Sequence, residues 1–181
     1  MRLSRTLSAT VAAAALTALT ACGSNDDTGG QGLPKAKDVA AMERFVSQYT
    51  VCKELRAENP SEQGNRSDFE DLPKGTGAGV KERAYCEADR GQPIALVAVS
   101  DMKKFVQALK ANEQAGKDST GALVGADFAV IPTDDTTTRA LKAAGLLVAS
   151  CDPTFNARIP SGYTKREGLV DGCVMTDFIP A

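Results

Sequence analysis

The sequence predicts an α+β fold, in which one compact domain holds a mixed, partly antiparallel sheet with helices on one face, in ferredoxin-like layering. The main observation is the apolar run 94–99, Ile-Ala-Leu-Val-Ala-Val, which is typical of a buried central strand. Stretches with helical spacing of apolar residues precede and follow this run. The segment 34–181 is long enough to bury one core, and we therefore expect a single domain there.

The first elements expected are a helix and a β-hairpin. Apolar residues recur at steps of three or four after Pro34 and predict a helix that ends near Cys52. Residues 56–80 are polar and rich in glycine and proline, and such a long segment in a compact domain is usually functional or mobile. Turn residues join a short strand at 83–88 to the apolar run 94–99, which predicts a hairpin.

The second half of the domain is expected to repeat helix and strand. Asp101 is a suitable N-cap for the helix that follows the central strand. Residues 122–131 predict a strand or hairpin, residues 139–144 a short helix, and residues 146–149 the final strand. The remaining tail, 152–181, contains several prolines and glycines and is expected to be irregular.

The N-terminus has the order of a secretory signal, and residues 1–21 are expected to be removed as a signal peptide. A basic start precedes an apolar stretch that is too short to span a bilayer. The stretch ends in Leu19-Thr20-Ala21-Cys22-Gly23, which resembles the lipobox of bacterial lipoproteins. An ordinary secretory signal in which Cys22 happens to follow Ala21 is the alternative.

Membership of the lipoprotein class implies that the Cys22 thiol carries a diacylglyceryl group and that the new N-terminus is acylated. Two or three acyl chains hold a soluble domain firmly at a bilayer. Residues 22–33 are polar and glycine-rich and predict a flexible tether. We therefore expect a lipid-anchored protein on the extracytoplasmic face of the cell membrane, with no cofactor besides the covalent lipid.

The other four cysteines are predicted to form two disulfides, because the space outside the membrane is oxidising. Three connectivities are possible. We favour Cys52–Cys86 and Cys151–Cys173, since each pair closes a local loop rich in glycine, proline and polar residues. Metal ligation is disfavoured, because the chain has no Cys-x-x-Cys pair and no histidine.

Composition excludes several classes of function. The expected mature chain has 19 Lys and Arg against 23 Asp and Glu and no basic cluster, so nucleic acid is not an expected partner. The absence of histidine excludes Ser-His-Asp and Cys-His catalysis. Any enzyme built on this chain would have to use carboxylates, lysine or tyrosine.

No catalytic or metal-binding residue is predicted. Ser100 and Asp101 end the central strand, but no Gly-x-Ser-x-Gly surrounds them and a helix cap explains both. Asp134 and Asp135 likewise suit a helix start. The glycine-rich stretch 74–79 lacks the Gly-Lys-Ser/Thr ending of a phosphate-binding loop.

Two loop regions are candidates for binding a partner, because a rigid scaffold commonly presents binding groups on its loops. The first contains the acidic residues Asp68, Glu70 and Asp71, which lack the spacing of a calcium loop. The second contains Tyr163, which is expected to be exposed, and Arg166.

The arrangement also resembles small surface lipoproteins of actinobacteria that have no assigned activity. The resemblance covers 1–55 and 84–149, and it implies location and general form without catalytic residues. The chain departs from this group in its segment 56–80 and in its disulfide-closed tail. The matching features are the lipobox with its tether, the helix leading to Cys52, Cys86 before an apolar strand, and the stretch 121–130.

The preferred functional interpretation is a non-catalytic module that binds a protein or another component of the cell envelope. The alternative is a small carboxylate-based enzyme or a solute-binding protein tethered to the membrane. A concave pocket with converging carboxylates would favour the enzyme. A flat patch near 56–80 or 155–172 would favour the binding module.

Overall fold

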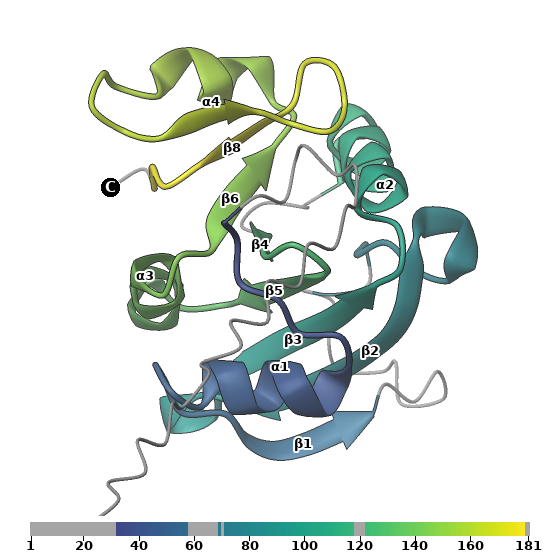
Figure 1. Cartoon of the computed structure of the whole chain (residues 1–181), viewed down its shortest axis with the longest axis vertical. Helices are drawn as coiled ribbons and strands as arrows, with labels where there is room; N and C mark the ends of the chain where they lie inside the picture. Colours follow the sequence, from purple (N-terminus) through teal and green to yellow (C-terminus); the bar gives the residue numbers. More distant parts are fainter. Residues whose placement is uncertain (1–31, 58–68, 70, 118–121, 180–181) are drawn as a thin grey trace, which may run out of the picture.

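A computed structural model describes residues 32–57, 69, 71–117 and 122–179 (Figure 1). Its helices are α1 (Val39–Val46), α2 (Met102–Gln114), α3 (Asp135–Ala143) and α4 (Pro153–Arg158). Its strands are β1 (Lys53–Ala57), β2 (Val80–Glu87), β3 (Pro93–Val99), β4 (Leu123–Val124), β5 (Phe128–Pro132), β6 (Leu147–Ser150), β7 (Lys165–Glu167) and β8 (Val174–Thr176). None of the helices within these residues is long and apolar enough to cross a membrane.

The eight strands form one sheet in the order β1-β2-β3-β5-β4-β6-β8-β7, and each described pair is antiparallel. The predicted α+β class and the single compact domain are confirmed. The sheet differs from the expected mixed sheet, because every described pair of neighbouring strands runs antiparallel.

β3 lies inside the sheet and is buried on both faces. Side chains alternate along a strand, so Ile94 and Leu96 point into one apolar cluster while Ala95 and Val97 point into the other. A strand that is apolar on both faces requires cover on both faces. The apolar run therefore dictates a three-layer arrangement.

The helices divide between the two faces. α1 and α3 pack on the face of Leu96, and Phe155 of α4 packs against the same cluster. α2 packs on the opposite face through Phe105, Val106 and Leu109. The expectation of helices on one face is therefore wrong for α2, because the second apolar face of β3 also has to be covered.

The first helix is shorter than its apolar spacing predicts. α1 ends at Val46, and the next four residues turn, with the Ser47 amide donating to Glu43 O at 2.9 Å. Tyr49, which fits the helical spacing, is 46% exposed. The chain then enters β1, an edge strand whose five residues are all exposed and which the sequence did not predict.

The C-terminal tail is more regular than expected. Residues 152–179 contain α4 and the hairpin of β7 and β8, which continues the sheet beyond β6. This part forms the upper end of the molecule in Figure 1. β7 is short and polar, which is why the sequence pattern gave no strand there.

The predicted helix caps are confirmed. The Asp101 carboxylate accepts from the Lys104 amide at 3.0 Å, and the Asp134 carboxylate accepts from the Thr137 amide at 2.8 Å. Gly79 approaches the first of these caps closely, since its carbonyl accepts from the Ser100 amide at 2.8 Å. A side chain at Gly79 would collide with the Asp101 carbonyl oxygen, so glycine is required there.

Both predicted disulfides are confirmed. Cys52–Cys86 ties the entrance of β1 to β2 across a sequence separation of 34 residues. Cys151–Cys173 ties the end of β6 to the entrance of β8 across 22 residues. Each bond therefore joins a terminal part of the sheet to its neighbour.

Replacing Cys52 and Cys86 together with alanine should lower the free energy of unfolding by about 3 to 4 kcal/mol, because the unfolded chain gains the entropy that the bond removes. Urea unfolding of the variant and the parent protein measures the difference. Mass spectrometry of non-reduced peptides should show Cys52 linked to Cys86. A peptide that links Cys52 to Cys151 or Cys173 would contradict the topology of the sheet.

Candidate functional site

A pocket of about 680 Å³ lies beside β6, between the C-terminal end of α2 and α4. Its size is within the range of about 300 to 1,000 Å³ typical of small-molecule sites. Side chains from three helices, one strand and the C-terminal segment surround it. Its lining residues are Glu113, Gly116, Lys117, Asp135, Thr138, Val148, Ala149, Ser150, Asp152, Phe155, Arg158, Phe178 and Ile179.

The short strand β4 explains why the pocket lies there. β4 pairs with Leu147 and Val148 and therefore does not run along the whole of β6. Ser150, near the end of β6, pairs with Val174 of β8 on its other side and lines the pocket. The pocket thus lies where α2, from one face of the sheet, and α4, from the other, both reach β6.

Aromatic side chains form one wall of the pocket. The ring centroids of Phe155 and Phe178 are 5.8 Å apart, and those of Phe178 and Tyr163 are 5.1 Å apart in an edge-on arrangement. Tyr163 is 45% exposed, as the sequence predicted. The row of rings therefore leads from the pocket to the surface of the protein.

Two carboxylates contribute to the pocket from adjacent elements. Glu113 on α2 accepts from the Cys151 amide at 3.0 Å through Oε2. Asp152, the next residue along, caps α4 by accepting from the Thr154 amide at 2.8 Å through Oδ1. Each carboxylate thus uses one oxygen to hold the backbone in place.

The environment of Glu113 raises the pKa of its carboxyl above the ordinary value of 4.5. Burial is the largest cause, because the charged form loses water. The hydrogen bond from Cys151 lowers the pKa, and the negative charge of Asp152 raises it again. The two carboxylates are thus close enough to repel each other.

The other charged residues of the lining are mostly held by partners outside it. Lys117 forms an ion pair of 3.1 Å with Asp71, and Asp135 forms one of 3.7 Å with Arg139. Arg158 is exposed and forms no ion pair with the described residues.

The structure places the predicted binding residues at separate sites. Asp68 and Glu70 lie outside the described residues, as do Cys22 and the signal segment. Asp71 is next to the pocket through its ion pair with Lys117. Arg166 is exposed on β7, whereas Tyr163 packs on Phe178 beside the pocket.

A buried arginine holds the chain near Asp71 against the sheet. Arg83 is 7% exposed, and its guanidinium donates to the carbonyls of Leu72 at 3.1 Å and Pro73 at 3.3 Å. It also donates to the Tyr85 hydroxyl at 2.8 Å. Arg83 thus fixes the segment from which Asp71 reaches Lys117.

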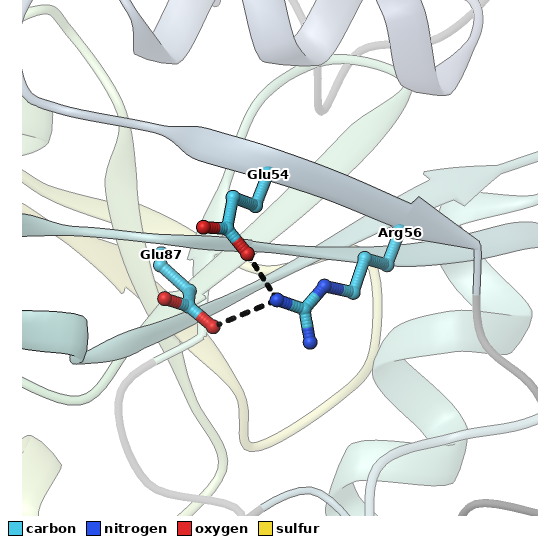
Figure 2. A network of polar contacts seen from close by, with 3 residues as sticks. All are labelled: Glu54, Arg56 and Glu87. Carbon is cyan, nitrogen blue, oxygen red and sulfur yellow. Dashed lines mark hydrogen bonds and ion pairs between the residues drawn. The ribbon is translucent and has the colours of Figure 1, made fainter.

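A second charged cluster lies far from the pocket, on the edge formed by β1 and β2. Figure 2 shows Glu54 and Glu87 both reaching the same nitrogen of the Arg56 guanidinium, with the Glu87 oxygen at 3.4 Å. Glu54 has a left-handed φ of 53° at an irregularity in the pairing of β1. Because the cluster is largely exposed, its ion pairs contribute little stability, but its charges disfavour pairing with another sheet edge.

Sequence reasoning missed Glu113, Asp152, Phe155 and Phe178 as site residues. Each is unremarkable in its own segment. Asp152 and Phe155 are neighbours on α4, and the order of strands in the sheet brings Glu113 and Phe178 to the same pocket. Among the described residues, no group of three or more acidic or cysteine side chains is placed to hold a metal ion.

Replacing Glu113 with glutamine should change how stability depends on pH. In the native state the Glu113 carboxyl keeps its proton to a higher pH than in the unfolded chain. The free energy of unfolding therefore falls as the pH rises from 4.5 through the native pKa of Glu113. The glutamine variant lacks this loss and should gain stability relative to the parent between about pH 4 and pH 7.

Urea unfolding at both pH values measures this difference, and Glu82→Gln on the exposed side of β2 controls for the loss of one charge. The amide oxygen of glutamine can still accept from Cys151. A variant that loses stability relative to the parent as the pH rises would contradict the assignment.

No protein-family model, no curated protein and no solved structure matches this chain. The function is therefore inferred from the residues of the pocket and from the sequence itself.

Proposed function

We propose that the protein is a lipid-anchored, extracytoplasmic binding protein that takes a small ligand from the envelope space into the pocket beside β6. The single observation that carries the proposal is the pocket itself, with its volume of about 680 Å³ and its mixture of aromatic and charged walls. This proposal follows the alternative drawn from the sequence, a tethered solute-binding protein, because the pocket is concave and the expected sign of a partner-binding module was a flat patch. The concave shape favours a small molecule over a flat protein surface as the ligand.

The nature of the walls supports binding. Apolar walls with a few placed polar groups are typical of ligand sites, since apolar surface supplies affinity and polar groups orient the ligand. Phe155, Phe178 and Ile179 supply the apolar part here. Glu113 and Asp152 supply polar groups whose backbone hydrogen bonds already fix their positions.

The extracytoplasmic location rests on the sequence and agrees with the disulfides. The lipobox at Cys22 belongs to residues outside the described part, so the lipid anchor is part of the proposal. Two disulfides in a domain of this size are typical of proteins that fold in an oxidising compartment.

A carboxylate-based enzyme is the second candidate, and the raised pKa of Glu113 beside Asp152 favours it. The geometry offers a simpler account. One oxygen of each carboxylate accepts a backbone amide at the junction of β6 and α4, so both groups are held in position and can bind a ligand without a reaction. We therefore rank binding first.

Replacing Cys22 with serine should release the protein from the membrane, because the serine hydroxyl does not take the diacylglyceryl group. Fractionation of cells into membrane pellet and soluble fraction measures this, with Ser24→Ala as a matched tether variant that should stay in the pellet. The domain should remain folded. Recovery of the serine variant in the pellet would refute the lipid anchor.

Binding in the pocket can be tested with a library of small aromatic fragments followed by ligand-observed NMR. Phe178→Ala should weaken fragment binding by about three- to tenfold, the usual contribution of an aromatic contact. Tyr49→Ala removes an exposed ring packed on Phe45, away from the pocket, and should leave binding unchanged. Fragments that bind equally well to both folded variants would refute the pocket as the binding site.

A further inference from the structure

We infer that the ligand of this pocket carries a protonated amine on an apolar body, with the amine placed between Glu113 and Asp152. The inference rests on the proposed binding function and adds the chemical class of the ligand.

A pair of carboxylates contributes negative charge to the pocket. Glu113 reaches the pocket from α2 and Asp152 from the start of α4, and both line it. One oxygen of each accepts a backbone hydrogen bond, which leaves the other oxygen available to a ligand. Like charges held close together attract a cation, because the cation removes their mutual repulsion.

Within the described residues, no lysine or arginine forms an ion pair with either of these two carboxylates. Lys117 lines the pocket, but its ammonium pairs with Asp71 at 3.1 Å. Asp135 adds negative charge and is offset by Arg139. Arg158, at the end of α4, is the remaining cation of the lining.

α4 spaces its pocket residues in a definite order. Asp152, Phe155 and Arg158 follow each other at intervals of three residues, so they lie along one side of the helix. Six residues of helix span about 9 Å. The backbone positions of Asp152 and Arg158 are therefore separated along α4, and no ion pair joins these two described residues.

The aromatic wall determines the rest of the ligand. An apolar body attached to the amine can pack on Phe155 and Phe178, whose rings are 5.8 Å apart. An ammonium group near aromatic faces also gains cation–π attraction. The lining of the pocket thus combines two carboxylates with aromatic rings.

An amine fits this end better than a metal ion. An ammonium group has three donors and can satisfy the free oxygens of Glu113 and Asp152 together. Calcium requires six to eight oxygen ligands, and the described residues provide no cluster of three acidic groups.

The experiment titrates the mature protein with 2-phenylethylamine, 2-phenylethanol and 3-phenylpropionate, which share a phenyl ring and differ in charge. NMR or calorimetry gives each dissociation constant at neutral pH. The amine should bind most tightly. Glu113→Gln and Asp152→Asn should each weaken it about tenfold through loss of a charge-assisted hydrogen bond.

Both substitutions keep an amide oxygen that can accept the Cys151 or Thr154 hydrogen bond, so folding should be preserved. Glu82→Gln, which removes an exposed carboxylate on β2, is the matched control and should not change binding.

Equal or tighter binding of the alcohol or the anion would overturn the inference, as would unchanged binding of the amine to both folded carboxylate variants. If aromatic fragments bind through Phe178 but no amine probe does, the ligand class is wrong and the binding function stands. If neither fragments nor amines bind, the proposed function fails as well.

Discussion

The double-sided burial of β3 is the constraint on which the rest of the structure depends. Its apolar residues alternate between two clusters, so neither face of the sheet can be left to water. α2 has to cross to one face, while α1, α3 and α4 cover the other. Because α2 and α4 then approach β6 from opposite faces, the space between them becomes the pocket. The site is thus a consequence of how the central strand is covered.

The segment 150–152 links the fold to the site. Ser150 ends β6, Cys151 forms a disulfide with Cys173, and Asp152 starts α4. The amide of Cys151 also donates to Glu113, so the covalent bond and the carboxylate hold the same residue from two sides. This makes the position of the carboxylate pair part of the folded framework, where groups are positioned more precisely than on a free loop.

The sequence predicted those elements that have a strong apolar pattern or a clear cap. β3, α2 and the two disulfides follow directly from the run 94–99, from Asp101 and from the even number of remaining cysteines. β1 was missed because an exposed polar edge strand has no alternation to detect. The pocket was missed because residues such as Glu113 and Phe178 meet only through the strand order, which places β6 and β8 side by side.

The requirements of folding do not explain why residues 113 and 152 are acids and not the corresponding amides. Glutamine at 113 can accept the Cys151 hydrogen bond without the cost of burying a charge, and asparagine at 152 can cap α4 as well as aspartate does. The chain instead keeps two acids that repel each other, and the lysine of the pocket lining pairs with Asp71. Such an unrelieved arrangement in a concave site is typical of functional residues. A cationic ligand would offset both charges and would account for the presence of two acids at this position.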